Sequence, residues 1–327
     1  MYLHSLGHFH PETIIDNAFF EELEIGTDNE WIVTRTGIRT RHTVLPLDYI
    51  RHTRNADPRA ADEASRYTNA DAACRAASMA LQRAGLQRSD IGMVIAGTSA
   101  PRMGAPGEAS LIAEKIGISA PCFDINAACS TFGVQLRVLS MMAPESTPDF
   151  VLLVQPENLT RAVNYSDRRT AVLMGDCTTA AILSHRIPSA IRAARITMSS
   201  DPLAWRKVTI PCMGHLQQDG GAVQNFAIRK MGALIEEIGE GRRDFWFVGH
   251  QANLPMLQSV CARGGVEESR HLYNVDARGN CGAAGAPSVI SERFGSFQPG
   301  DEVLVAVVGA GLTWAGFQLQ FGAEARQ

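Results

Sequence analysis

Five continuous apolar runs, separated by helical stretches, restrict the fold of this chain more than any other feature. Runs of this length without polar alternation are typical of strands that are buried on both faces. Alanine- and leucine-rich stretches at 72–85 and 226–239 are expected to be helices that cover such a sheet. The pattern predicts an α/β fold. The runs are IGMVIAG (91–97), FVLLVQ (150–155), TAVLMG (170–175), FWFVGH (245–250) and EVLVAVVGAG (302–311).

An internal similarity predicts that the fold consists of two related halves. CFDINAACS (122–130) and LYNVDARGNCGAAG (272–285) both alternate apolar and polar residues and then pass into small residues. Each follows an apolar run after a charged turn. We therefore expect the two segments to occupy equivalent places in halves that span residues 1–185 and 186–327. This arrangement would bring Cys129 of the first half close to residues of the second half.

The overall composition excludes several classes of protein. The 327 residues are 45% hydrophobic and 20% charged, with a net charge of −4, so no basic field suggests nucleic acid as a partner. No apolar run approaches the roughly 18 residues of a membrane span, and the N-terminus does not resemble a signal peptide. The seven cysteines are scattered without a C-x-x-C pair, which argues against disulfides or zinc. We expect a cytoplasmic protein that binds neither membrane nor nucleic acid.

A group of histidines near the N-terminus could also suggest a metal site. His4, His8 and His10 follow the pattern H-x(3)-H-x-H. A solvated N-terminal strand or turn explains this spacing more simply, so we expect no metal ion there.

Cys129 lies where an apolar run gives way to small residues, at a predicted junction between a strand and a helix. An unpaired cysteine is often a small buried side chain. At a helix N-terminus, however, the helix dipole favours the thiolate, which is the nucleophilic form of cysteine. The residue is thus either a packing residue or a nucleophile, and the surrounding motifs favour the second interpretation.

Five motifs, in this order along the chain, resemble those of the beta-ketoacyl-[acyl-carrier-protein] synthase III family, condensing enzymes of the thiolase fold. The resemblance runs nearly from end to end, and the departures described below favour a specialised branch of the family. It implies duplicated αβαβα layered halves, each with a mixed five-stranded sheet. The motifs are DNEWIVTRTGIRTRH (28–42), DINAACSTF (124–132), VGHQAN (248–253), DARGNCGAAGAP (276–287) and VGAGLTWAGFQLQF (308–321).

The resemblance implies an acyltransferase that performs an acyl-CoA-primed decarboxylative Claisen condensation. Cys129 would take the acyl group from coenzyme A as an acyl-cysteine. The condensation partner would be a malonyl or beta-ketoacyl thioester on a carrier protein. A malonyl thioester would lose CO₂, and His250 and Asn280 would hold the developing oxyanion. One such donor is worth about 3 kcal/mol. Neither step needs a metal or redox cofactor, since the coenzyme A thioester is a substrate.

Further residue roles follow from the same resemblance. The backbone N–H groups of Cys129 and of the 309–311 loop, at Ala310 and Gly311, would form a second oxyanion hole. Trp31 and Arg168 would flank the adenine of coenzyme A, and Arg35 would contact its phosphates. Asn253 would line the pantetheine tunnel or order the active site. The family also implies a homodimer.

Departures from the family pattern concern the substrates. Ala105 stands where many members have an aromatic residue that closes the acyl pocket of the neighbouring subunit, so we expect medium or longer acyl chains. Pro255 replaces a basic residue that helps to dock the carrier protein in other members. The sequence therefore does not define which carrier this chain uses, or whether it uses one. Residues 44–69 form a long segment that could be an entrance lid.

Two other functions stay open at this stage. An acyltransferase of the same fold could pass the acyl group to an alcohol or amine, but an acidic residue tends to replace Asn280 in that branch. A non-catalytic partner subunit usually lacks the nucleophile, which Cys129 supplies here.

Overall fold

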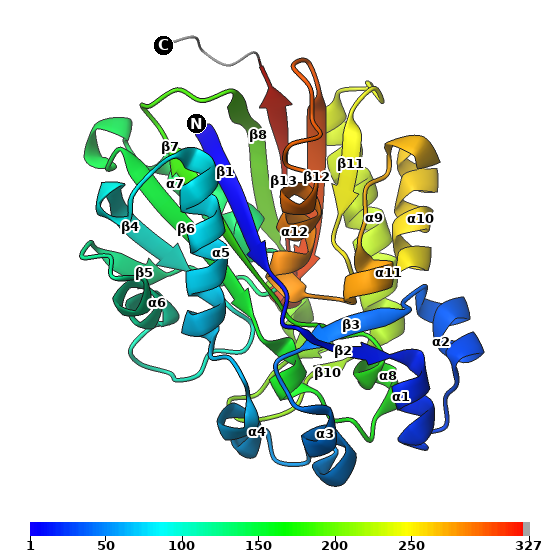
Figure 1. Cartoon of the computed structure of the whole chain (residues 1–327). Helices are drawn as coiled ribbons and strands as arrows, with labels where there is room; N and C mark the ends of the chain where they lie inside the picture. Colours follow the sequence, from blue (N-terminus) through cyan, green and yellow to red (C-terminus); the bar gives the residue numbers. More distant parts are fainter. Residues whose placement is uncertain (323–327) are drawn as a thin grey trace.

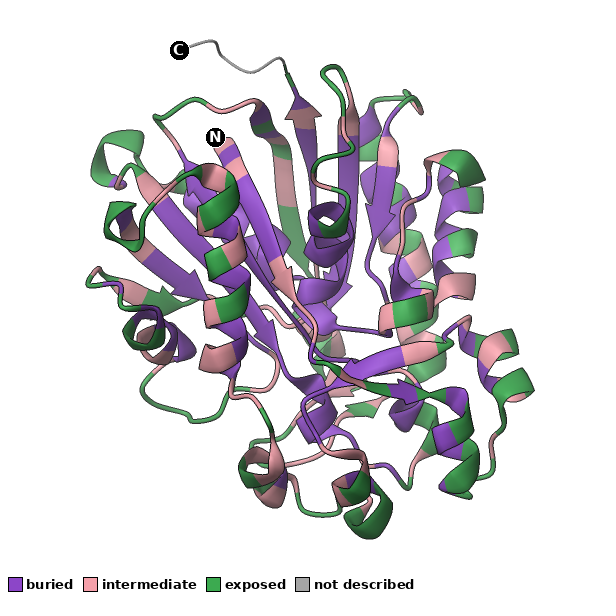
Figure 2. Ribbon diagram, in the orientation of Figure 1, coloured by how far each residue is buried: buried purple, intermediate pink, exposed green. Residues whose placement is uncertain are grey.

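The computed structural model describes residues 1–322, and a mixed sheet of nine strands runs through it (Figure 1). Most of its strands are buried on both faces (Figure 2), as the apolar runs predict. In spatial order the strands are β11 (Trp246–Gly249), β12 (Glu302–Gly309), β13 (Thr313–Phe321), β8 (Ile191–Ser200), β1 (Tyr2–Phe9), β7 (Cys177–Ser184), β6 (Phe150–Glu157), β4 (Ile91–Ala96) and β5 (Cys122–Asp124).

The sheet contains the same topology twice. The order β4-β6-β7-β1 and the order β11-β12-β13-β8 both begin with a parallel pair and continue with antiparallel pairs. Strand β1 joins the two halves by pairing with β8 through Tyr2 and Leu3. The segments that resemble each other in sequence lie at equivalent places, since β5 runs parallel beside β4 and His271 makes a parallel bridge to β11.

The expected number of strands in the second half was wrong. The first half has five strands, but the second has four, and a single bridge between Phe247 and His271 takes the place of the fifth. The chain leaves the sheet there because the side chain of Gln251 accepts hydrogen bonds from the backbone N–H groups of Asn274 (3.1 Å) and Val275 (3.3 Å). These groups are therefore not available for a ladder with β11.

Helices complete the layers of an αβαβα arrangement, which confirms the predicted thiolase-like α/β fold. Helices α7 (Thr131–Met141) and α12 (Gly285–Glu292) each contact strands of both halves and form the central layer. Helices α5 (Asn69–Ala84) and α6 (Glu108–Ile116) cover the outer face of the first half. On the second half, α9 (Gly220–Gly239) packs on β12 and β13, and α10 (Leu254–Gly264) packs on α9.

Shorter elements gather at one end of the sheet (Figure 1) and include the 44–69 segment. Ile50 and Ala61 of that segment are buried in a cluster with Leu159 and Val163. The elements of this end are β2 (Thr13–Asp16), α1 (Asn17–Glu22), α2 (Asn29–Thr36), β3 (Thr40–Thr43), α3 (Leu47–Thr53), α4 (Pro58–Ala64), α8 (Arg168–Ala171), β9 (Val208–Thr209), β10 (Gln217–Gln218) and α11 (Val275–Arg278).

The run at 170–175 was wrongly expected to be a strand. The Asp167 side chain caps the short helix α8 by accepting from the backbone N–H of Arg169 (3.0 Å). The following residues then pair with Asn280, whose N–H donates to Leu173 (2.8 Å) and whose carbonyl accepts from Gly175 (3.0 Å). The apolar run thus supports the loop that carries a predicted site residue.

The N-terminal histidines were expected in a solvated strand or turn, but the structure shows a different environment. Strand β1 lies in the middle of the sheet, and α5 and α12 pack against it. His8 therefore bonds to Ser291 (2.8 Å), and His10 lies 3.5 Å from the carboxylate of Glu292.

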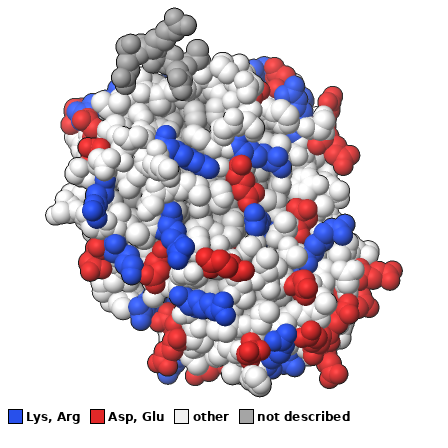
Figure 3. All heavy atoms as spheres, viewed as in Figure 1, with Lys and Arg blue, Asp and Glu red and all other residues white. Residues whose placement is uncertain are grey.

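The surface is mixed in charge on the face that Figure 3 shows, where basic and acidic side chains alternate over the molecule. Among the helices of residues 1–322, none combines the length and the apolar character that a membrane span requires.

Candidate active site

Cys129, His250 and Asn280 line one cavity of about 250 Å³. Cys129 comes from the turn between β5 and α7, His250 directly follows β11, and Asn280 lies between α11 and the short 3-10 turn η6 (Gly282–Ala284). The fold therefore brings together, from both halves, the three side chains that the sequence motifs single out.

The turn that carries Cys129 is held in an unusual backbone conformation. Ala128 has a φ of 48°, which is costly for a residue with a Cβ. Side chains fix this turn, because Asn126 accepts from the N–H of Ala128 (2.9 Å) and Thr131 accepts from the N–H of Ala127 (2.9 Å). Gly309 packs so closely that a Cβ there would lie 2.6 Å from the carbonyl oxygen of Ala127. The glycine thus lets the 309–310 backbone approach the cysteine.

The electrostatics of Cys129 differ from the expected thiolate. The residue comes just before Ser130, the N-cap of α7, so it does lie at a helix N-terminus. Burial and the carboxylate of Glu157 nevertheless raise the pKa of the Cys129 thiol to about 12, against a smaller lowering by its own backbone N–H. Both effects favour the neutral thiol in the free protein and oppose the effect of the helix N-terminus.

His250 is a neutral imidazole. Burial lowers the pKa of His250 to about 4, and its Nδ1 is buried without a hydrogen-bond partner among the described residues. A neutral imidazole carries one N–H donor and one acceptor nitrogen. It is suited to donate to a developing oxyanion without carrying a charge of its own.

The amide of Asn280 is oriented by its neighbours. Its Oδ1 accepts from the backbone N–H of Gly282 (3.0 Å), so its NH₂ group is the end that can donate to a ligand. Gly279 and Gly282 flank it with φ values of 71° and 54°. The left-handed conformation at both positions favours glycine, and it produces the tight turn that presents Asn280.

Most of the remaining cavity wall is apolar, and sequence reasoning missed it. Val223, Phe226 and Ala227 follow helical spacing, which could have indicated one face of a helix but not that the face borders a cavity. The polar lining residues besides the three site residues include Ser99, Asn126 and Gln218. The apolar ones include Leu159, Met174, Val208, Ile210, Leu216, Val223, Phe226, Ala227, Met256, Val308 and Leu312.

The predicted oxyanion and acyl-pocket residues divide into two groups. Gly309 and Ala310 line the cavity, whereas Gly311 is not among its lining residues. Ala105 is exposed and lies outside the cavity of its own chain. Its role requires a second subunit and stays a prediction.

Three of the four residues predicted to bind coenzyme A form a separate cluster. The guanidinium carbons of Arg35 and Arg168 lie 4.8 and 4.9 Å from the ring centre of Trp31, a stacking arrangement. Asn253 caps α10 by accepting from the N–H of Met256 (2.9 Å). None of the four lines the cavity, and their binding roles stay predictions.

Across residues 1–322, no three His, Cys, Asp or Glu side chains come together in a way that could hold a metal ion.

A central and a C-terminal part of the chain each match a described family. Residues 123–202 match 3-oxoacyl-[acyl-carrier-protein] synthase III, and residues 239–321 match the C-terminal region of the same enzyme. The two matches contain Cys129 and the pair His250 and Asn280, respectively.

Similar proteins cover almost the whole chain. The beta-ketoacyl-[acyl-carrier-protein] synthase III of Vesicomyosocius okutanii is 30% identical, with 96% of this chain and 97% of that protein covered. The crystal structure of the Aquifex aeolicus synthase III has a TM-score of 0.85 at 26% identity, covering 98% and 99% of the two chains. That of the Thermus thermophilus enzyme has the same TM-score at 29% identity, with 98% and 99% covered. The chain therefore belongs to the beta-ketoacyl-[acyl-carrier-protein] synthase III family of acyltransferases.

Proposed function

We propose that the chain condenses an acyl group from acyl-CoA with a malonyl group on an acyl-carrier protein, with release of CO₂. The observation that carries this proposal is the set of polar side chains in the cavity wall. The wall holds one nucleophile, Cys129, and two neutral N–H donors, His250 and Asn280. A nucleophile stores the acyl group, and the two donors suit the oxyanion that forms when a malonyl thioester loses CO₂.

The first half-reaction is acyl transfer to Cys129. Its Sγ attacks the thioester carbonyl, the bond to the sulfur of coenzyme A breaks, and the proton of the thiol passes to the departing thiolate. Because Cys129 is a thiol in the free protein, this proton must move during the attack. The backbone N–H of Cys129 and the adjoining loop at Ala310 would stabilise the tetrahedral oxyanion.

The second half-reaction forms the carbon–carbon bond. The bond between the malonyl carboxylate and the α-carbon breaks, CO₂ leaves, and the charge on the thioester oxygen is held by His250 and Asn280. The α-carbon then attacks the acyl-cysteine, and the released Cys129 thiolate takes up a proton from solvent. The residues present thus account for each step, and coenzyme A acts only as a substrate.

The apolar wall supports an acyl chain as the occupant of the cavity. Each buried methylene contributes about 0.8 kcal/mol, so we propose medium or longer chains as primers. The Trp31 cluster supports binding of coenzyme A nearby, since an indole and two guanidiniums suit adenine and phosphate. The seven unpaired cysteines support a reducing, cytoplasmic setting.

The edge strand β5 supports a homodimer. It ends the sheet, and its Phe123 is 39% exposed. An uncovered edge strand with an exposed aromatic residue is suited to pair with a second copy. Such a dimer could bring the exposed Ala105 loop of one subunit to the cavity of the other.

The test separates the two half-reactions. Intact-protein mass spectrometry with acetyl-, octanoyl- and dodecanoyl-CoA should show one added acyl group, which Cys129→Ser abolishes. Addition of malonyl-carrier protein should then remove the acyl group and yield a beta-ketoacyl product. Transfer to an alcohol or amine instead, or labelling that persists in Cys129→Ser, would contradict the proposal. Ala105→Phe should shift the preference toward acetyl-CoA, and an unchanged profile would contradict the role of Ala105.

A further inference from the structure

Glu157 is a buried carboxylate beside the active site that the two half-reactions do not use. It is the last residue of β6 and is completely buried. Its oxygens accept from the N–H and hydroxyl of Ser99 (3.1 and 3.0 Å), the hydroxyl of Thr98 (3.4 Å) and the N–H of Ala283 (3.2 Å). Every group that donates to this carboxylate is neutral, and a buried charge without a cation is costly.

These hydrogen bonds connect two segments that meet at the cavity. Ser99 is one of its lining residues, and Ala283 belongs to the turn that follows Asn280. Between them, Gly282 packs on the carboxylate so closely that a Cβ there would lie 3.0 Å from the carboxyl carbon of Glu157. The N–H of the same Gly282 donates to Oδ1 of Asn280 and so sets the direction of its amide.

We propose that Glu157 is a positioning residue for the condensation: its carboxylate fastens the Asn280–Ala283 turn to the Thr98–Ser99 loop and thereby keeps the NH₂ group of Asn280 in place as an oxyanion donor. This inference rests on the proposed function. Glu157 acts through Asn280 and does not touch the substrate in this scheme.

The charge of Glu157 has a second, opposite effect on the first half-reaction. The carboxylate raises the pKa of the Cys129 thiol, after burial itself. Loss of the charge should therefore make Cys129 easier to ionise while it loosens the turn that holds Asn280. A purely structural role of Glu157 would not make Cys129 react faster with an alkylating agent while it makes condensation slower.

The experiment compares Glu157→Gln, Glu157→Asp and the wild type in three measurements. These are acylation of Cys129 by octanoyl-CoA, condensation of the acylated protein with malonyl-carrier protein, and alkylation of Cys129 by iodoacetamide at pH 8, followed on its peptide by mass spectrometry. We expect Glu157→Gln to lower condensation tenfold or more, to leave acylation equal or faster, and to speed alkylation several-fold.

The second variant separates the charge from the reach of the side chain. Glu157→Asp keeps the charge but is one methylene shorter, so alkylation should stay slow while condensation falls. It also keeps the inference testable if Glu157→Gln does not fold. The matched control is Glu145→Gln, which removes an exposed carboxylate that takes no part in the described hydrogen bonds and should change none of the three rates.

Two results would overturn different claims. Condensation at the wild-type rate in a folded Glu157→Gln, with the wild type active, would overturn the positioning role alone. A wild type that becomes acylated but does not condense with malonyl-carrier protein would overturn the proposed function, and the inference would fall with it.

Discussion

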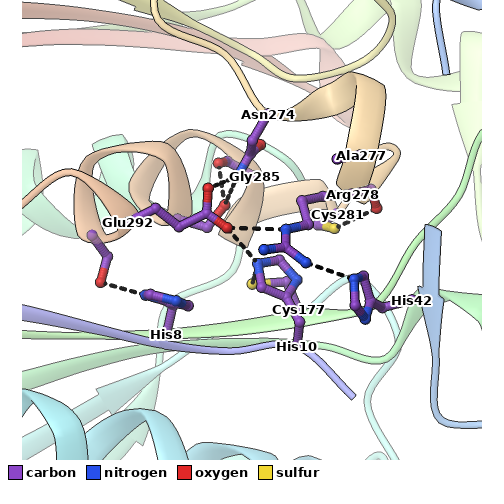
Figure 4. A network of polar contacts seen from close by, with 12 residues as sticks. His8, His10, His42, Cys177, Asn274, Ala277, Arg278, Cys281, Gly285 and Glu292 are labelled. Atoms are coloured by element: carbon purple, nitrogen blue, oxygen red, sulfur yellow. Dashed lines mark hydrogen bonds and ion pairs between the residues drawn. The ribbon is translucent and has the colours of Figure 1, made fainter. Parts of the chain in front are cut away.

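Two carboxylates hold the segment around Asn280 from different sides, and they differ in the charge of their partners. Glu292 meets cationic groups (Figure 4), with Nε of Arg278 at 3.0 Å and Nε2 of His10 at 3.5 Å, and also accepts from the side-chain NH₂ of Asn274 (3.1 Å). Glu157 meets only neutral donors.

The two pKa values move in opposite directions for this reason. Burial raises the pKa of Glu157 to about 7, although the hydrogen bonds from Ser99, Ala283 and Thr98 oppose it. Burial also acts to raise the pKa of Glu292, but hydrogen bonds from His10 and Asn274 and the charge of Arg278 lower it to about 2. Glu157 is completely buried and has no cationic partner, whereas the side chain of Glu292 is 23% exposed and meets two cationic groups, so both the smaller desolvation and the charge of its partners favour ionised Glu292.

The comparison suggests different tasks. Glu292 ties the halves together, because His10 belongs to the first and Arg278 to the second, and Arg278 also donates to His42 (2.6 Å). Its charge is neutralised within the network. The charge of Glu157 is not neutralised by a cation and therefore reaches Cys129.

The largest expected effect concerns the residue that both carboxylates support. Asn280→Ala should retain acylation of Cys129 and lower condensation about 100-fold or more, the cost of one oxyanion donor. Separate assays of the two half-reactions would measure this. If the substitution abolished acylation and spared condensation, Asn280 would not be the donor for the decarboxylation step, and the reason for comparing its two supports would disappear.

The next prediction tests the direction in which the Glu157 side chain makes the unfolding free energy depend on pH. Its folded pKa of about 7 lies above the ordinary value of 4.5, so it contributes stability that is complete below about pH 4.5 and is lost as the pH rises through 7. Relative to Glu157→Gln, the wild type should therefore lose about 3 kcal/mol of unfolding free energy over this range. Urea unfolding at several pH values would measure the difference. Parallel pH curves for the two proteins would mean that Glu157 does not titrate abnormally.

Glu292 should make the unfolding free energy depend on pH in the opposite direction, and by a somewhat smaller amount. Its folded pKa of about 2 lies below 4.5, so it contributes stability above pH 4.5 that is lost as the pH falls toward 2. Because its side chain is 23% exposed, we expect Glu292→Gln to cost about 2 kcal/mol at pH 7. The same urea series should show that this cost shrinks below pH 4.5. A cost that grew on acidification would show that the cations do not stabilise the ionised form.

The contrast between these carboxylates explains where sequence reasoning succeeded and where it did not. The layers could be predicted because apolar runs are local patterns, and the roles of Cys129, His250 and Asn280 because their motifs resemble those of a known family. Glu157 and Glu292 could not, since their partners Ala283 and His10 are far away in the sequence. The same limit explains the N-terminal histidines and the run at 170–175, where long-range packing outweighed the local signal. At Cys129, burial and Glu157 oppose the thiolate that the helix N-terminus favours.

The smallest effect concerns one cation of the Glu292 network. Burial acts to lower the pKa of His10, but hydrogen bonds with Cys281 and Glu292 raise it above its ordinary 6.5. A raised histidine pKa contributes stability below pH 6.5 that is lost as the pH rises through the folded value. His10→Asn should therefore cost about 1.5 kcal/mol at pH 5.5, the lower end of the range for a hydrogen bond to a charged group, and less at pH 9. Arg278 still pairs with Glu292 in this variant, so condensation by the folded protein should change little. Urea unfolding at both pH values, with the condensation assay beside it, would measure these effects. An equal cost at both pH values would show that His10 is neutral in the fold, and Arg278 would then be the one charged partner that sets Glu292 apart from Glu157.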